Sequence, residues 1–206
     1  MKNHRWTRPL QILDASQWGT IIEDTARSAL ACPRQARALV ALLLLGEAGL
    51  RAAEALALDL ADISDDLTIT VHAGKGGKPR TVFLAPARAT ALDRYVAWAR
   101  PRLCPSAPTR SGPLIVGPHG RLSYWGLYRT VKVAAGVRPH LLRHSAASRW
   151  LRAGMNLVHV QILLGHSSLA TTQIYLHPTL DEVRASFLLA SGIPLEQALP
   201  LFGADR

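Results

Sequence analysis

The distribution of apolar and polar positions along the 206-residue chain predicts a mainly helical protein. Apolar side chains recur at helical spacing over most of the sequence, and Ser, Asp or Pro precede several of these segments where a helix would begin. The longest strongly apolar run, residues 38–45, is far shorter than the roughly 18 residues of a membrane-spanning helix, so it is interpreted as a buried core helix. We expect helices over residues 14–30, 33–46, 52–58, 86–103, 123–135, 140–153, 157–164, 168–176 and 181–190.

One stretch departs from the helical pattern. Residues 67–72 alternate apolar side chains with Thr, residues 80–84 are again typical of a strand, and the connection Gly74-Lys75-Gly76-Gly77-Lys78-Pro79 is rich in turn formers. These features predict a β-hairpin with Lys75 on its tip or flank. We also expect Pro101 to break the helix over residues 86–103 and residues 105–113 to form a surface loop. The fold class is therefore mainly α with a small antiparallel β-sheet (α+β).

Length and charge narrow the class of protein. The chain is long enough to bury a core and is most simply one domain, residues 1–206, with a basic arm over residues 1–15 and a tail over residues 192–206 that either packs on the domain or is exchanged between subunits. The formal net charge of +10 favours a polyanionic partner such as nucleic acid. Basic surfaces also serve solubility or contact anionic lipid, so charge alone leaves the partner open.

The cysteines and the start of the chain bear on its compartment. Cys32 and Cys104 are too few and too far apart to suggest a disulfide framework or a zinc ligand set, which fits a reducing compartment. The polar, basic residues 1–8 do not lead into an apolar signal core. We therefore expect a cytoplasmic protein, in the cytosol or nucleoid of a prokaryote.

Five motifs far apart in the chain carry residues suited to phosphate chemistry. They are Arg51 in Gly49-Leu50-Arg51-Ala52-Ala53-Glu54, Lys75 in the glycine-rich turn, His140 and Arg143 in Pro139-His140-Leu141-Leu142-Arg143-His144, His166 after Gly165, and Tyr175. Attack on a phosphodiester spreads negative charge over its nonbridging oxygens, and a guanidinium offers a permanently charged, planar fork that matches those oxygens. One helical turn separates His140 from Arg143, so both can face one phosphate.

The order Arg, Lys, His-x-x-Arg, Gly-His and Tyr resembles the tyrosine recombinase (phage integrase) family, over about residues 38–177. The resemblance implies the catalytic-domain fold of that family and site-specific recombination of double-stranded DNA, as integration, excision, inversion or resolution. It also implies self-association on DNA, from dimer to tetramer. Most family members have a separate amino-terminal DNA-binding domain. Only about 35 residues precede the helix that leads to Arg51, so we expect the catalytic domain without it.

The resemblance implies a role for each catalytic residue. Tyr175 would attack a DNA phosphate, forming a 3′-phosphotyrosyl bond and releasing a 5′ hydroxyl, and a 5′ hydroxyl of another strand would then attack that bond. Arg51, Arg143 and His166 would stabilise the nonbridging oxygens, and Lys75 would protonate the departing oxygen. A phenol with a pKa of about 10 needs a base or cationic surroundings, and His140 is the candidate base. The phosphotyrosyl bond stores the bond energy, so no ATP, metal or other cofactor is expected.

Further residues have predicted supporting roles with open alternatives. Glu54 lies three residues after Arg51, where it either forms a plain surface ion pair or orients a catalytic guanidinium. The helix over residues 123–135 is expected to lie against DNA, as in the family. Its alternative is a helix with core aromatics and solvated charges. The residues expected to contact DNA are Lys78, Arg80, Arg121, Arg129 and Lys132.

Other kinds of site and function fit parts of the sequence. His140 and His144 stand four residues apart and could chelate a metal, but Leu141 replaces the Glu of a His-Glu-x-x-His motif and Arg143 would repel a cation. A type IB topoisomerase or a relaxase-like nicking protein would use similar chemistry. A non-catalytic DNA-binding regulator would keep the fold alone. The His-x-x-Arg motif favours a recombinase, and the presence of every expected catalytic residue type argues against the regulator.

Overall fold

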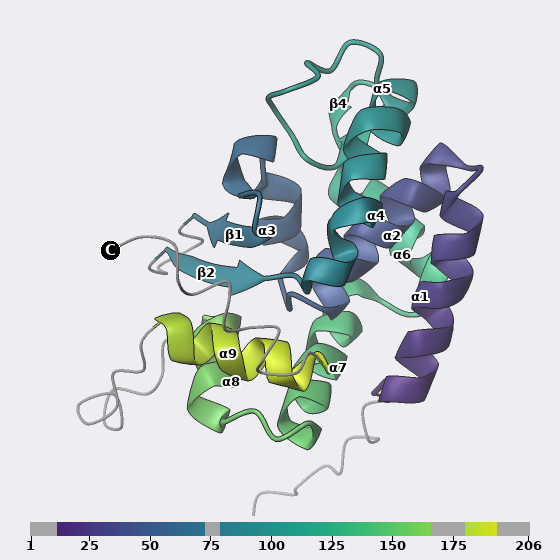
Figure 1. Ribbon diagram of the computed structural model, residues 1–206. Helices are drawn as coiled ribbons and strands as arrows, with labels where there is room; N and C mark the ends of the chain where they lie inside the picture. The colour runs from purple at the N-terminus through teal and green to yellow at the C-terminus, as the bar shows by residue number, and fades with distance from the viewer. Residues whose placement is uncertain (1–11, 73–78, 166–179, 193–206) are drawn as a thin grey trace, which may run out of the picture.

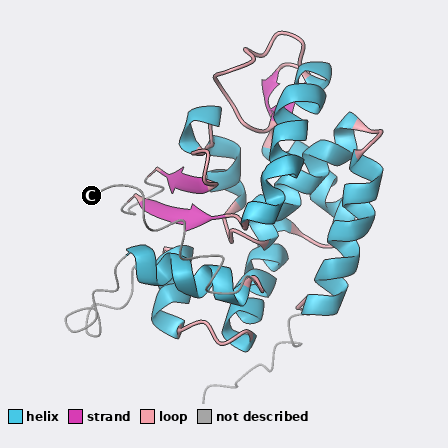
Figure 2. Ribbon diagram, viewed as in Figure 1, coloured by secondary structure: helices cyan, strands magenta, loops and turns pink. Residues whose placement is uncertain are grey.

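The computed structural model describes residues 12–72, 79–165 and 180–192, which are mainly helical (Figure 1, Figure 2). The α-helices are α1 (Ala15–Ala29), α2 (Pro33–Gly46), α3 (Ala52–Ala57), α4 (Ala89–Arg94), α5 (Arg100–Leu103), α6 (Tyr124–Ala135), α7 (Pro139–Arg152), α8 (Leu157–Leu164) and α9 (Leu180–Ala190). Leu60–Asp62 and Pro86–Arg88 are single 3₁₀ turns. The predicted fold class is confirmed, and the predicted helix over residues 168–176 lies outside the described residues.

Helix α2 forms the centre of the core. It begins at Pro33, as predicted, and every residue from Ala38 to Gly46 is buried. The helix can be apolar on all sides because α1, α4, α6 and α7 pack around it. Burying each of its leucines contributes about 2 kcal/mol to folding. Among the described residues, no helix combines the length and the apolar character needed to cross a membrane.

The predicted β-hairpin is also confirmed. Strands β1 (Thr68–Val71) and β2 (Arg80–Phe83) are antiparallel, with Ile69 opposite Val82 and Val71 opposite Arg80. Helix α8 packs against β2, and the ring of Phe83 lies 5.9 Å from that of Phe187 in α9. The hairpin is therefore held against the carboxy-terminal helices (Figure 1). The connection between the two strands, with Lys75 and Lys78, lies outside the described residues.

The prediction that Pro101 breaks its helix is wrong. The chain passes from α4 through a π-helical turn, Tyr95–Ala99, into α5, which contains Pro101 and ends at Leu103. A proline lacks an N–H and its ring clashes with the carbonyl four residues earlier in a regular α-helix. The wider π turn, in which the Arg100 N–H donates to the Tyr95 carbonyl, accommodates the proline without ending the helix.

The loop after α5 is organised by a buried arginine. Residues 105–113 form no helix or strand, as predicted. Arg100 is 1% exposed and donates hydrogen bonds to the carbonyls of Pro108, Ser111 and Pro113. A second small hairpin follows, formed by β3 (Val116–Gly117) and β4 (Gly120–Arg121). It was not predicted, although the sequence Gly-Pro-His-Gly at residues 117–120 is typical of a turn.

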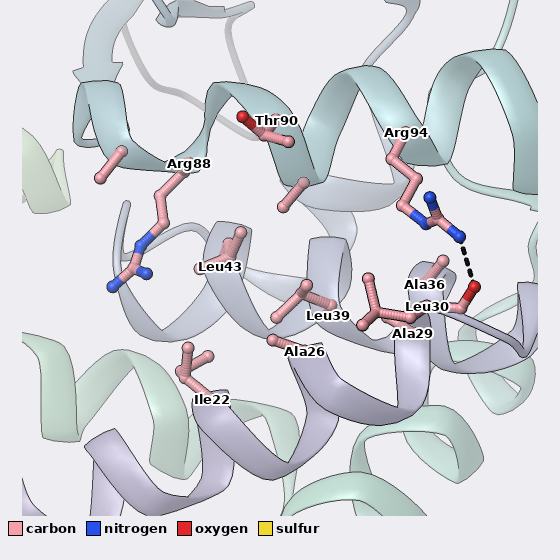
Figure 3. A pocket seen from close by; sticks show the side chains of 12 residues that line it. Ile22, Ala26, Ala29, Leu30, Ala36, Leu39, Leu43, Arg88, Thr90 and Arg94 are labelled. Atoms are coloured by element: carbon pink, nitrogen blue, oxygen red, sulfur yellow. Dashed lines mark hydrogen bonds between the residues drawn. The ribbon is translucent and has the colours of Figure 1, made fainter.

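An apolar cleft of about 230 Å³ lies between α1, α2 and α4 (Figure 3). Its walls are mostly Ala, Leu and Ile side chains, with Arg88 and Arg94 on the α4 side. Arg88 pairs with Glu47 at 2.9 Å, and Arg94 donates to the carbonyl of Leu30. Within the described part of the chain, none of the predicted site residues lines this cleft. The cleft is therefore separate from the candidate active site.

Candidate active site

The turn that precedes α3 sets the position of Arg51. Gly49 has a φ of +72°, a conformation that favours glycine. A Cβ at this position would lie 2.6 Å from the Trp150 ring, so a side chain is excluded by packing as well as by conformation. Two residues later Arg51 is the N-cap of α3. The predicted location of Arg51 at the start of a helix is confirmed.

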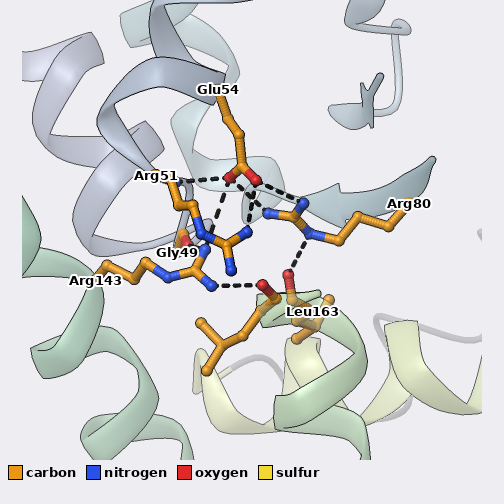
Figure 4. Close-up of polar contacts among 7 residues, drawn as sticks. Gly49, Arg51, Glu54, Arg80, Arg143 and Leu163 are labelled. Carbon is orange, nitrogen blue, oxygen red and sulfur yellow. Dashed lines mark hydrogen bonds and ion pairs between the residues drawn. The ribbon is translucent and has the colours of Figure 1, made fainter. Parts of the chain in front are cut away.

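Glu54 is the centre of the polar contacts at this site (Figure 4). Its side chain is 7% exposed. It accepts a hydrogen bond of 2.7 Å from the backbone N–H of Arg51 and one of 2.9 Å from Arg51 Nη1. Arg80 donates from Nη1 and Nη2 to the two carboxylate oxygens, at 2.9 and 2.7 Å. The predicted pairing of Glu54 with Arg51 is confirmed, and the carboxylate is buried between cations instead of lying on an open surface.

Arg143 reaches the same carboxylate from α7. Its side chain is 5% exposed, and Nη1 lies 3.7 Å from Glu54 Oε2. Nη1 donates to the Gly49 carbonyl at 2.7 Å, and Nη2 donates to the Leu164 carbonyl at 2.5 Å. The fold thus brings together Arg51 and Arg143, which come from helices far apart in the chain, around one buried carboxylate.

Burial and neighbouring charges shift the pKa values of the groups in this cluster. Burial raises the pKa of Glu54, but hydrogen bonds from Arg80 and Arg51 outweigh this effect and bring it to about 2. Burial and then the positive charge of Arg51 lower the pKa of Arg143 to about 10, so its guanidinium stays protonated at neutral pH. Three guanidinium groups around one carboxylate leave an excess of positive charge. A preorganised positive site of this kind suits the charge that develops on an attacked phosphate.

His140 lies in the first turn of α7, one turn before Arg143, as the spacing predicted. It is exposed, and its Nε2 lies 2.8 Å from Nε2 of His144, with the two rings nearly perpendicular at 84°. One imidazole therefore donates to the other. Burial, then the neighbouring His140 and Arg143, lower the pKa of His144, which favours its neutral form. Within the described ranges, no group of three His, Cys, Asp or Glu residues gathers that could hold a metal ion.

Four predicted site residues, Lys75, Lys78, His166 and Tyr175, lie outside the described residues, and their roles stay predictions. The structure does describe how the chain leaves α8 just before His166. The last residue of α8 is Leu164, and Gly165 follows in the left-handed conformation with a φ of +62°. The Leu164 carbonyl is bound by Arg143, so the residue before Gly165 lies at the guanidinium cluster.

Arg80 was predicted to contact DNA, and the structure gives its guanidinium internal partners. Its side chain is 11% exposed. Arg80 pairs across the hairpin with Val71, which is buried, and precedes the buried Val82 by two positions. Alternate residues of a strand share a face. Residues 80–84 do not alternate in the sequence, so the buried position of Arg80 follows only from its pairing with β1, whose burial does alternate. DNA contact by Arg80 stays an untested prediction.

The other predicted DNA-contacting residues lie on or beside α6. Arg121 pairs with Asp59 at 2.5 Å and donates to the Leu58 carbonyl just after α3, and Lys132 donates to the Gly136 carbonyl. Arg129 is exposed. Tyr124 and Trp125 are 51% and 68% exposed, so they are not the core aromatics of the alternative interpretation. The Trp125 ring contacts those of Tyr124 and Tyr128 edge to face, with ring centroids 5.9 and 5.8 Å apart.

Comparison with known proteins defines the class of this protein. The sequence pattern of the phage integrase family matches residues 11–182, and the chain therefore belongs to this family. It is 36% identical to tyrosine recombinase XerD of Mycobacterium tuberculosis over 159 residues, 74% of this chain and 51% of that protein. The chain spans about half the length of the curated relatives it matches.

Two solved recombinase structures have a fold similar to that of this chain. XerA recombinase has a TM-score of 0.63 and 25% identity, covering 97% of this chain and 67% of that one. XerH site-specific recombinase, at 24% identity, has a TM-score of 0.63 and covers 100% of this chain and 58% of that one. The predicted tyrosine recombinase catalytic-domain fold is confirmed. The family membership agrees with the order of the motifs along the chain.

Proposed function

We propose that this protein is a site-specific DNA recombinase that cleaves and rejoins double-stranded DNA through a 3′-phosphotyrosyl bond to Tyr175. The observation that carries the proposal is the convergence of Arg51 and Arg143 on Glu54, within 2.9 and 3.7 Å of its oxygens. A single arginine usually lies on the protein surface and forms only a weak ion pair. Two guanidiniums held beside a buried carboxylate form a fixed positive site that suits a phosphate.

The residues of the cluster would contribute in different ways, because they differ in exposure and in hydrogen-bond partners. Arg51 is 46% exposed on its side chain, which leaves it accessible to a DNA phosphate. Arg143 is nearly buried and is fixed by two backbone carbonyls, so it would stabilise the developing charge without rearranging. Glu54 orients Arg51 through two hydrogen bonds. Glu54 would therefore act on the reaction by positioning Arg51 and not by binding the phosphate.

The remaining steps rest on residues with predicted roles. The Tyr175 oxygen forms a bond to phosphorus as the bond to the 5′ oxygen breaks, and Lys75 supplies the proton that the departing oxygen takes up. His140 accepts the phenolic proton, and His166 donates to a nonbridging oxygen. Attack by the 5′ hydroxyl of a second strand then reverses these steps and restores the phenol. The number of phosphodiester bonds is unchanged, so the cycle consumes no nucleotide.

Double-stranded DNA is the proposed partner, with two to four copies of the chain assembled on it. The XerH structure of similar fold is bound to its difH substrate in a pre-cleavage complex. The formal net charge of +10 on the present chain supports binding to such a polyanion. The proposed place of action is the cytoplasm, and residues 192–206 would either pack on the domain or dock on a neighbouring copy.

A covalent-trapping experiment tests this proposal. Fragments of genomic DNA that carry nicks, so that cleavage beside a nick traps the covalent adduct, are incubated with the protein. The mixture is then denatured, and the DNA that remains attached to the protein is sequenced. We expect a protein–DNA adduct that survives denaturant, with the attached ends clustering at a few sites. Tyr175→Phe should form none, while Tyr124→Phe, a matched change on exposed α6, should still form the covalent adduct. An adduct formed by Tyr175→Phe would contradict the assignment of the nucleophile.

Further assays on the trapped sites separate the alternatives. A recombinase exchanges strands between two sites and does so with increasing efficiency as protein copies fill both sites. A type IB topoisomerase or relaxase-like protein would relax or nick a plasmid that holds one site. Specific binding without any adduct would indicate the non-catalytic regulator. The orientation of paired sites then distinguishes integration, excision, inversion and resolution by product size.

A further inference from the structure

Arg80 links three elements of the fold by hydrogen bonds. Its Nη1 and Nη2 groups donate to the two oxygens of Glu54 at 2.9 and 2.7 Å, and its Nε donates to the carbonyl of Leu163 at 2.8 Å. These contacts join β2, which carries Arg80, to α3 and to the end of α8 (Figure 4). With the side chain only 11% exposed, this cation makes its described contacts inside the protein.

The geometry of these contacts requires an arginine. The two parallel hydrogen bonds to one carboxylate and the third bond from Nε all lie in the plane of one guanidinium. A lysine would bring the same charge but only one nitrogen, and it would satisfy either Glu54 or Leu163. Because the side chain shares the buried face of the hairpin with Val82, water has little access to replace a lost bond.

Arg80 also contacts the carboxy-terminal end of α8 and the residue that follows it. The last four carbonyls of a helix have no partner within it. In α8 the carbonyl of Leu163 is bound by Arg80 and that of Leu164 by Arg143. The next residue, Gly165, lies directly against Arg80, since a Cβ there would be 2.9 Å from Arg80 Cδ and 3.0 Å from Nη1. The backbone position from which His166 follows is therefore set by two guanidiniums.

We propose that Arg80 is a positioning residue of the active site. Through Glu54 it orients Arg51, and through Leu163 and Gly165 it fixes the chain that enters His166. In this role Arg80 would act through Glu54 and the end of α8, and not directly on the phosphate or on Tyr175. This assignment rests on the proposed recombinase function, and it replaces DNA contact as the main role of Arg80.

The test separates chemistry from DNA binding. Arg80→Gln and Arg80→Lys are compared with wild type for the dissociation constant of a suicide duplex and for the single-turnover rate of adduct formation at saturating DNA. We expect a rate about 10- to 100-fold lower in both variants, because small displacements of catalytic groups are costly. The dissociation constant should stay within about threefold of wild type, since a buried side chain releases few counterions from DNA. Arg129→Gln on exposed α6 is the matched control and should show the opposite split.

A double-mutant cycle with Glu54→Gln tests how Arg80 acts. If Arg80 works through Glu54, then Arg80→Gln should lower the rate much less in the Glu54→Gln protein than in the wild-type background. Loss of folded protein would instead scale the amplitude of adduct formation and leave its rate constant unchanged. Circular dichroism and thermal unfolding of each variant are recorded alongside, and Arg80→Lys retains the positive charge if Arg80→Gln does not fold.

The outcomes are distinct for this assignment and for the function on which it rests. Wild-type rate constants in folded Arg80 variants would overturn the positioning role. A loss of DNA affinity with an unchanged saturated rate would also overturn it and return Arg80 to the DNA interface. If wild-type protein forms no adduct on any trapped DNA, the recombinase function itself fails.

Discussion

The guanidinium cluster around Glu54 and the exposed face of α6 use the same kinds of residue in opposite surroundings. In the cluster, Arg80 and Arg143 are 11% and 5% exposed on their side chains and are held by hydrogen bonds to fixed acceptors. On α6, Arg129 is exposed beside Trp125, which is 68% exposed. Fixed cations suit one phosphate at a defined position, whereas exposed ones can adapt to an extended polyanion. The contrast predicts that substitutions in the cluster alter rate and those on α6 alter affinity.

The largest difference is expected from Arg143→Lys compared with Arg129→Lys. Lysine at position 143 keeps the charge but loses the fork that binds the carbonyls of Gly49 and Leu164, so fewer oriented donors remain for the phosphate. We expect the single-turnover rate of adduct formation to fall by about 100- to 1,000-fold for Arg143→Lys. Arg129→Lys should stay within about twofold. Equal rates for the two variants at saturating DNA would remove the proposed distinction between the regions.

A second prediction concerns the pH dependence of stability. The pKa of Glu54 is depressed to about 2 in the folded protein, so its ionised form stabilises the fold above its usual pKa and this contribution is lost as the pH falls from about 4.5 to 2. We expect a loss of roughly 2 kcal/mol in the free energy of unfolding over this range that is absent from Glu54→Gln. Urea denaturation at several pH values measures it.

The control for this measurement is Asp24→Asn. Asp24 forms an ion pair with Arg27 on the surface of α1, with side-chain exposures of 64% and 75%. Such exposed pairs contribute little to stability. The pH dependence of Asp24→Asn should therefore match wild type. Asp66, whose pKa is also near 2, titrates in the same window, so the informative quantity is the difference between Glu54→Gln and wild type.

A third prediction concerns DNA binding by the exposed face of α6. If the exposed guanidinium of Arg129 neutralises a phosphate, Arg129→Gln should reduce the slope of log K against log salt concentration by about 0.9 and weaken binding several-fold at physiological salt. Arg27→Gln, an exposed change on α1, is the matched control and should leave the slope unchanged. Fluorescence anisotropy of a labelled duplex at four salt concentrations gives both slopes.

The smallest effect on stability is expected from Trp125→Ala. Since its side chain is 68% exposed, its removal should change the free energy of unfolding by no more than about 0.5 kcal/mol. Trp150→Ala removes a buried ring packed against Gly49 and should cost about 3–5 kcal/mol. Chemical denaturation compares the two variants. A large loss for Trp125→Ala would show that the α6 aromatics belong to the packed structure and not to a contact surface.

Local sequence signals predicted most of the helices and the hairpin. Pro33 begins α2, Arg51 stands at the start of α3, and the glycine-rich connection lies between β1 and β2. These features follow from rules that operate over a few residues. The hairpin of β3 and β4 was not predicted, and Pro101 did not end its helix, because a π-helical turn before it accommodated the proline.

The roles of individual charged residues were harder to predict. Arg80 and Arg121 were grouped with Arg129 as expected DNA contacts. In the structure Arg80 binds Glu54 and Arg121 binds Asp59, while Arg129 is exposed. Arg80 lies on the same face of the hairpin as the buried Val71 and Val82, but only the tertiary fold, which brings Glu54 of α3 and Leu163 of α8 to it, supplied its partners.

The sequence by itself determined the residue types of the site and their order along the chain, because propensities and motif spacing are local. It also determined which segments are helical and the excess of positive charge. Only the tertiary structure decided which arginines share a carboxylate, since Arg51, Arg80 and Arg143 meet through long-range packing of α3, β2 and α7. Burial at that meeting point removes competing water, and this is why identical guanidiniums become fixed at Glu54 and remain exposed on α6.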